Sequence, residues 1–252
     1  MHLFQQSYSG SLYDVYRSHV HDSGMESSDA GERQESHHAH QKERDKMVNR
    51  QIVEKGVTDH AVIAAMRRVP RHRFIPHNQS VDAYGDFPLA IGHKQTISQP
   101  YIVAYMTQAL TLQPNERVLK IDTGSEYQAA ILGELGVQVF SIEIVKPLGE
   151  QAQEVLADLG YSNVTVRVGD GYQGWPEESP FDAIILTAAP DHIPSPLLEQ
   201  LAIGGRLIPP VGDRLQHLVF IHRTTEGYQQ TDLLSVVFVP MTGKSEKQTS
   251  SQ

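Results

Sequence analysis

The sequence predicts an α/β fold with a mostly parallel central sheet and helices on both faces. Apolar segments of strand length alternate with helix-length segments between about residues 117 and 208. Two of the helical segments end at a glycine, Gly136 and Gly160, just before the next apolar segment. The last two strand-like segments are separated only by a short turn with Gly227, which suits an antiparallel pair at one sheet edge.

The elements follow one another in a regular order. Two helical patterns come first, at about 45–55 and from an N-cap at Thr58 to the stop at Pro70. Strands are then expected at 117–121, 137–142, 164–168, 181–186, 206–208, 217–222 and 234–239. Helices are expected at about 129–135, 147–159 and 196–202. Strands separated by helices of this length form βαβ units, and the order therefore predicts parallel pairing.

Composition excludes several classes of protein. The 252 residues carry a formal net charge of −9, which disfavours a broad nucleic-acid surface. The absence of cysteine excludes disulfides, cysteine nucleophiles and thiolate metal sites. No apolar run approaches the roughly 20 residues that span a bilayer, and residues 1–20 lack the pattern of a secretory signal. We therefore expect a cytoplasmic protein, a monomer, that binds neither nucleic acid nor membrane.

The chain divides into three parts. Residues 1–46 form an N-terminal extension, which we expect to be largely disordered because residues 23–44 are polar and Ser-rich. Residues 47–243 form the folded domain, and residues 244–252 a disordered tail. His37, His38 and His40 invite a metal site, but no carboxylate or thiolate framework surrounds them. We therefore favour a solvated tail and predict no metal.

Candidate ligand-binding residues follow three strands of the predicted sheet. The first strand leads into the turn 122–127, the second ends at Glu143, and the third ends at Asp170 between two glycines. In an open parallel sheet, ligands bind at the carboxyl ends of the strands. Glu143 suits ribose hydroxyls and Asp170 an adenine amino group, although each could equally be an ordinary strand-end or turn acid. The pattern predicts a nucleoside-containing cofactor and leaves dinucleotides and S-adenosylmethionine as alternatives.

One family resemblance separates these alternatives. The segment Gly-His-Lys-Gln-Thr-Ile-Ser-Gln-Pro at residues 92–100 closely resembles the signature of the protein-L-isoaspartate O-methyltransferase family. Residues 68–76, 168–175, 181–185 and 239–243 are similar to the same family and occur in its order. The resemblance covers about residues 47–243 and leaves the first 46 outside.

The resemblance implies a Rossmann-like, S-adenosylmethionine-dependent methyltransferase fold with added elements at its ends. Its activity would be protein repair: methyl transfer from S-adenosylmethionine to the α-carboxylate of L-isoaspartyl residues in damaged proteins and peptides. Ser98 would lie beside the transferring methyl as the catalytic, orienting residue, although by position it could instead be an N-cap. The implied cofactor-binding residues are Gln95, Thr96, Ile97, Asp122, Thr123, Gly124, Ser125, Glu143, Asp170, Gly171 and Thr242.

The turn after the first strand departs from the family pattern Glu-Ile-Gly-Thr-Gly-Ser-Gly-Tyr. Lys120 replaces an acid, Asp122 and Glu126 replace glycines, and Lys94 replaces a glycine in the signature segment. A side chain where the backbone needs a positive φ costs about 1–2 kcal/mol. Lys120 would oppose a cationic donor, Glu126 would repel the donor's carboxylate, and Asp122 would return negative charge.

These departures keep two other functions open. One is a non-catalytic family member that binds isoaspartyl or other peptide segments without cofactor turnover. The other is a methyltransferase with a different acceptor.

Overall fold

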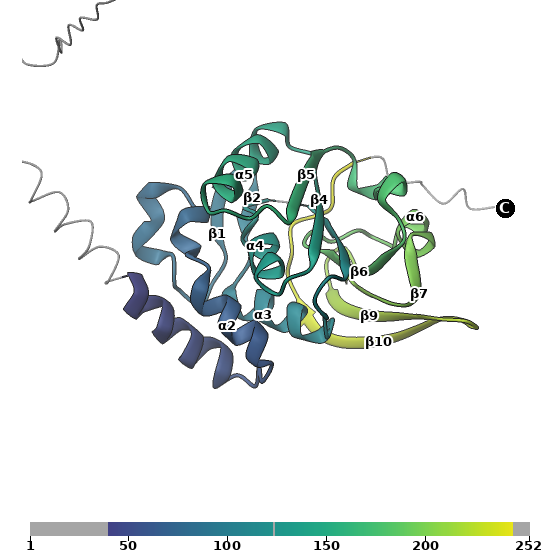
Figure 1. Ribbon diagram of the computed structural model, residues 1–252, viewed down its shortest axis with the longest axis horizontal. Helices are drawn as coiled ribbons and strands as arrows, with labels where there is room; N and C mark the ends of the chain where they lie inside the picture. The colour runs from purple at the N-terminus through teal and green to yellow at the C-terminus, as the bar shows by residue number, and fades with distance from the viewer. Residues whose placement is uncertain (1–39, 123, 244–252) are drawn as a thin grey trace, which may run out of the picture. The chain divides into compact units, whose positions relative to one another are not determined.

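The computed structural model describes residues 40–122 and 124–243. Its centre is a sheet of strand order β10-β9-β7-β6-β3-β4-β5, and β8 pairs with β9 (Figure 1). The bounds are β3 Arg117–Ile121, β4 Gln138–Glu143, β5 Val164–Val168, β6 Phe181–Leu186, β7 Leu201–Ile208, β8 Pro210–Val211, β9 Gln216–Thr224 and β10 Gly227–Val236. The helices between them are α4 Tyr127–Glu134, α5 Lys146–Asp158 and α6 Ser195–Glu199.

The strand order places a switch point at β3. The chain runs from β3 to β4 and β5 on one side, then crosses to β6 and β7 on the other, and all these neighbours pair in parallel. The remaining strands are antiparallel, with β9 paired to β7 and β10 paired to β9 across the turn at Thr225 and Glu226. The predicted sheet and its antiparallel edge are therefore confirmed. A switch point is where open parallel sheets bind ligands, so the turn after β3 is the first place to search for a site.

Alternating side chains of the central strands bury both faces of the sheet. Val118 and Ile185 face α4 and α3 (Pro100–Ala109), where they contact Met106, Leu110 and Leu132. Leu119, Ile121 and Ile184 face the opposite way and pack with Leu197 of α6. Strands buried on both faces carry near-continuous apolar sequence, as β6 does with Phe-Asp-Ala-Ile-Ile-Leu.

Elements before β3 lie together at one side of the sheet (Figure 1). They are η1 Val48–Val53, α2 His60–Arg68, η2 Arg71–Phe74, η3 His77–Asp82, and the hairpin of β1 Leu89–Gly92 and β2 Gln95–Ile97. This hairpin was not predicted from the sequence. Its turn residues His93 and Lys94 have φ values of 50° and 61°, the conformation of a two-residue turn that usually uses asparagine or glycine.

Four predicted boundaries differ from the structure. Asp59 rather than Thr58 caps α2, because its carboxylate accepts hydrogen bonds from the backbone N–H groups of Ala61 and Val62. The first helix starts by His40 rather than at Asp45, and its buried Arg44 packs with the domain. The structure describes nothing before residue 40, so the expectations for residues 1–39 and for His37 and His38 lie outside the described residues. The predicted tail at 244–252 does as well.

The other two differences concern strand length. β7 begins at Leu201, so residues 201 and 202 are strand rather than helix, and its internal Gly204 and Gly205 hid this from the pattern. β10 begins at Gly227 rather than residue 234. The prediction missed its first half because that half is exposed, polar and without apolar alternation. Residues 237–239 follow the strand instead of belonging to it.

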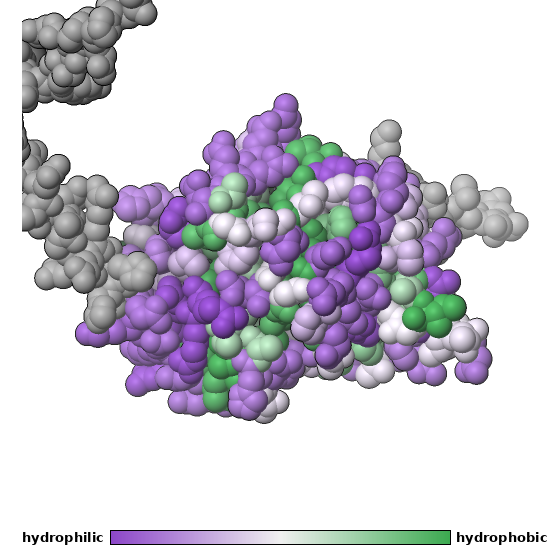
Figure 2. Space-filling model, in the orientation of Figure 1, coloured by the Kyte–Doolittle hydropathy of each residue, from purple (hydrophilic) through white to green (hydrophobic). Residues whose placement is uncertain are grey.

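The surface shown in Figure 2 is mostly hydrophilic, with hydrophobic side chains in narrow areas between polar ones. Within the described ranges, no helix is long and apolar enough to cross a membrane. The same residues contain no cluster of three or more histidine or acidic side chains that could hold a metal ion.

Candidate active site

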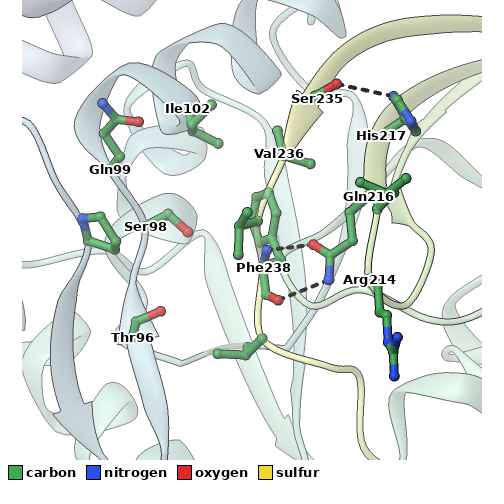
Figure 3. Close-up of a pocket in the computed structure, with 14 residues that line it drawn as sticks. Thr96, Ser98, Gln99, Ile102, Arg214, Gln216, His217, Ser235, Val236 and Phe238 are labelled. Atoms are coloured by element: carbon green, nitrogen blue, oxygen red, sulfur yellow. Dashed lines mark hydrogen bonds between the residues drawn. The ribbon is translucent and has the colours of Figure 1, made fainter.

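A groove with a volume of about 750 Å³ separates the start of α3 from the ends of β9 and β10 (Figure 3). Thr96, Ser98 and Ile102 line one wall, and Gln216 and Phe238 belong to the other. The Gln216 side chain fixes the far wall, because it accepts a hydrogen bond from the Phe238 N–H at 2.6 Å and donates one to the Phe238 carbonyl at 3.1 Å. Most of the remaining lining is apolar, as is usual for a ligand-binding cleft of this size.

A second, smaller hollow of about 20 Å³ lies at the carboxyl end of β3. Thr96 and Ser98 line this hollow as well as the groove, and they are joined there by Asp122, Gly124 and Ser125 of the turn. Ser98 therefore borders both the groove and the strand-end turn. The alternative role of Ser98 as a helix cap is wrong, because Gln99 occupies the cap position of α3 and no side chain caps that helix.

The turn after β3 has left-handed backbone at three alternate positions. Asp122, Gly124 and Glu126 have φ values of 66°, 52° and 63°. Asp122 and Glu126 are the two positions where glycines are usual in the family, so each carries the cost of about 1–2 kcal/mol expected for a side chain in this region. Other contacts of the turn must therefore stabilise these two left-handed residues.

Glu126 points down onto the sheet rather than into the hollow. Its side chain is fully buried, and the Ser141 hydroxyl of β4 donates a hydrogen bond to its Oε1 at 2.8 Å. Ser141 pairs in register with Lys120 of β3, so both side chains lie under the start of α4. Glu126 is not among the described residues that line the hollow. The Glu126 side chain therefore does not occupy the space of the hollow, and the expected repulsion between Glu126 and the carboxylate of a bound donor remains a prediction.

Lys120 supplies the positive charge of this buried cluster. Its ammonium donates hydrogen bonds to the Asp122 carbonyl at 2.6 Å and to the Thr187 hydroxyl at 3.3 Å. The Thr187 hydroxyl in turn donates to the same Asp122 carbonyl at 2.6 Å. Burial lowers the pKa of Lys120, while the nearby Glu126, Asp122 and Glu143 oppose that shift. Lys120 and Glu126 are thus two buried opposite charges beneath the turn, and Lys120 holds its backbone through the Asp122 carbonyl.

The Glu143 carboxylate supports the turn from beneath. One oxygen accepts a hydrogen bond from the Gly124 N–H at 2.7 Å, and the other accepts one from the Val145 N–H at 2.7 Å. The side chain is fully buried and lies outside the described lining of the hollows. Each oxygen keeps a second lone pair, so the contact with ribose remains a prediction.

A third hollow, of about 10 Å³, continues the site toward β5. Asp122, Gly171 and Thr242 line it together with apolar side chains, among them Ile121 and Met241. Gly171 has to be glycine here, because a Cβ would lie 2.5 Å from Ile121 Cγ2 and 3.2 Å from Met241 Cε. The neighbouring Asp170 accepts a hydrogen bond from the Tyr172 N–H at 3.0 Å. Asp122 therefore lines both the hollow beside Ser98 and the hollow beside Gly171.

Most of the residues expected at the site come together in this way. Those that line one of the cavities are Thr96, Ile97, Ser98, Asp122, Gly124, Ser125, Gly171 and Thr242. Gln95 is buried in β2 but is not among the described lining residues, and Thr123 lies outside the described residues. Sequence reasoning missed the far wall of the groove, Gln216 and Phe238, and the hydroxyls of Ser141 and Thr187. The only available signal was the apolar run at 236–239 before Pro240.

Comparison with known proteins agrees with this geometry. Residues 42–246 match the family model of protein-L-isoaspartate(D-aspartate) O-methyltransferase. The chain belongs to this family. It is 53% identical over 202 residues to the protein-L-isoaspartate O-methyltransferase of Picosynechococcus sp., covering 80% of this chain and 91% of that one. It is 55% identical over 205 residues to protein-L-isoaspartate O-methyltransferase 1 of Syntrophobacter fumaroxidans, covering 81% of this chain and 96% of that one.

Solved structures place the fold in the same family. A candidate protein-L-isoaspartate O-methyltransferase from Plasmodium falciparum, solved in complex with S-adenosyl-L-homocysteine, superposes with a TM-score of 0.69 and 26% identity. The superposition covers 79% of this chain and 98% of that one. The family uses S-adenosylmethionine, and the hollows that border the turn are the candidate site for it.

The residues of these hollows fit such a donor. Apolar side chains and Gly171, which has no Cβ, line the hollow next to Thr242, and such a lining suits the face of a base. The Asp122 carboxylate supplies the charge that suits a sulfonium cation, and Ser98 lies at the opposite end, beside the groove. The order along the site is thus apolar slot, carboxylate and hydroxyl, and then the peptide-sized groove.

Proposed function

We propose that this chain transfers a methyl group from S-adenosylmethionine to the α-carboxylate of L-isoaspartyl residues in damaged proteins and peptides. The observation that carries the proposal is that Thr96 and Ser98 line both the 750 Å³ groove and the hollow at the turn. A peptide in the groove and a donor at the turn would meet at the Ser98 hydroxyl. The expected cytoplasmic location and monomeric state remain part of this proposal.

The chemistry asks little of the protein beyond position. A main-chain carboxyl titrates near pH 3.5, so the acceptor is already an anion at neutral pH and needs no general base. The bound donor supplies a methyl group on a cationic sulfur, which becomes a neutral thioether. Ser98 can donate one hydrogen bond to the acceptor carboxylate and so direct its other oxygen toward the methyl group.

The groove explains why the acceptor would be part of a peptide. Its far wall is built from β9 and β10, and its apolar lining of Ile102, Val236 and Phe238 can cover side chains on either side of the acceptor. Covering these neighbours excludes water from the reacting carboxylate, which strengthens its interaction with a cation. A small free acid would leave most of the groove empty.

The test is methyl transfer to a matched pair of peptides. The full chain is incubated with labelled S-adenosylmethionine and either an L-isoaspartyl peptide or the same sequence with L-aspartate. We expect methyl ester on the isoaspartyl peptide alone. Equal labelling of both peptides would show a different acceptor. No labelling by the folded chain, together with retained isoaspartyl-peptide binding, would support the non-catalytic alternative.

A further inference from the structure

Asp122 differs from every other charged group at the site. Among the described residues that line the two hollows at the turn, it is the only carboxylate. None of the described residues donates a hydrogen bond to its side chain, whereas both Glu143 oxygens accept backbone N–H groups. Its backbone is held firmly, since its N–H donates to the Ile142 carbonyl at 3.0 Å. The carboxylate therefore faces the hollows from a fixed main chain.

Asp122 is the charged group of the turn whose carboxylate borders the hollows. Lys120 and Glu126 carry opposite charges and are both buried below the start of α4. Lys120 also borders the hollow, but its ammonium is directed to the Asp122 carbonyl and the Thr187 hydroxyl. These two buried charges offset one another, and the Glu143 carboxylate is held by two backbone N–H groups outside the lining of the hollows. The negative charge that borders the hollows is therefore that of Asp122.

The position of Asp122 matches one atom of the donor in particular. It borders both the hollow with Ser98 and the hollow with Gly171 and Thr242. A molecule with its base at Gly171 and its reactive methyl at Ser98 carries its sulfur between the two. That sulfur is a cation before methyl transfer and uncharged afterwards, while the rest of the molecule is unchanged.

We propose that Asp122 is a specificity-determining residue that favours the sulfonium donor over the thioether product. The inference rests on the proposed function for the identity of the donor. A carboxylate beside the sulfur stabilises the cation and does little for the neutral thioether, so it raises affinity for the donor and promotes release of the product. The side chain of Asp122 thus contributes to donor binding, although its left-handed backbone costs stability.

The test compares two affinities in the same variants. Isothermal titration measures Kd for S-adenosylmethionine and for S-adenosylhomocysteine with the full chain, Asp122→Asn, Asp122→Gly, and Asp232→Asn as an exposed control on β10. We expect Asp122→Asn to weaken donor binding about tenfold and product binding less than twofold. Asp122→Gly should do the same, which separates loss of charge from any effect of the amide, and circular dichroism verifies the fold of each variant.

Several outcomes would overturn the proposal. Equal weakening of donor and product would show that Asp122 only shapes the turn. Tighter binding of both ligands by Asp122→Gly would show that the side chain obstructs the site. Absence of binding to the unmodified chain would overturn it as well. A donor-to-product ratio that depends on Asp122, without methylation of an isoaspartyl peptide, would refute the proposed function alone.

Discussion

Removal of the Lys120 ammonium should destabilise the fold strongly. Lys120→Met keeps the length of the side chain but leaves the Glu126 carboxylate buried at 0% exposure without its nearby positive charge. Leaving a buried charge without the opposite charge that compensates it costs about 3–5 kcal/mol, because the remaining charge is poorly solvated. The hydrogen bond from Lys120 to the Asp122 carbonyl is also lost, although Thr187 still donates to that carbonyl. We therefore expect a loss of at least about 3 kcal/mol.

The loss of stability should come from separating the two charges of Lys120 and Glu126, not from losing either side chain alone. In Lys120→Met/Glu126→Gln both charges are absent, and the glutamine amide can still accept the hydrogen bond from Ser141. The double variant should therefore be within about 1 kcal/mol of the unmodified chain, because a buried pair replaced by neutral groups is often close to neutral in stability. The two substitutions would then show a coupling energy of about 2 kcal/mol or more.

Urea unfolding followed by circular dichroism measures these differences, with Lys146→Met as the control. Lys146 carries the same charge at the start of α5, but its side chain is 72% exposed. Its removal should change the free energy of unfolding by less than about 1 kcal/mol. A loss below 1 kcal/mol for Lys120→Met, or additive effects in the double variant, would refute the ionic account of the turn.

Two further predictions concern the left-handed positions. Burial raises the pKa of Asp122 to about 6, with Glu143 adding to the shift and Lys120 opposing it. Because this pKa exceeds its unfolded value, Asp122 costs stability above pH 6 and not below about pH 4, so Asp122→Asn should gain up to about 3 kcal/mol at pH 7.5 and nothing at pH 4. A pH-independent gain in urea unfolding would contradict this. Lys94→Gly removes an exposed side chain at a φ of 61° and should raise Tm by about 2–4 °C, whereas a lower Tm would show that the lysine makes a stabilising contact.

Donor affinity should also depend on pH through the same carboxyl group. The charged groups that act on Asp122 are Glu143, which raises its pKa, and Lys120, which favours its ionised form. Protonation below pH 6 would remove the charge that the sulfonium meets. This offers a second readout for the role of Asp122, since product affinity should not follow the same titration.

Sequence periodicity predicted the central sheet well because its strands are buried on both faces. β3 and β6 were expected at the residues where the structure has them, since most of their side chains are apolar and buried. β5 was also expected at its observed residues, although it is an edge strand in which valine alternates with Thr165 and Arg167. β10 was predicted too short because an edge strand that faces solvent has no apolar period to detect. The β1–β2 hairpin was missed because its turn residues, His93 and Lys94, are not typical of left-handed backbone.

The site was predicted in part for a similar physical reason. Strand ends are visible in a sequence, so the turn, Gly171 and Thr242 could be named in advance. The direction of the Glu126 side chain could not, because it depends on Ser141 and Lys120, which are neighbours only across the sheet. The far wall of the groove could not be predicted either, since Gln216 and Phe238 lie 22 residues apart in the sequence and meet only in the folded chain.

The proposed methyl transfer depends most on Ser98 lying where the groove meets the turn. The most direct measurement is the steady-state rate of methyl transfer to an isoaspartyl peptide by Ser98→Ala, compared with Ser235→Ala on the opposite wall. Ser98→Ala should lower kcat by about tenfold to hundredfold while donor Kd stays within twofold, because only the orientation of the acceptor is lost. Ser235→Ala should retain the full rate. Equal rates for Ser98→Ala and the unmodified chain would contradict the account.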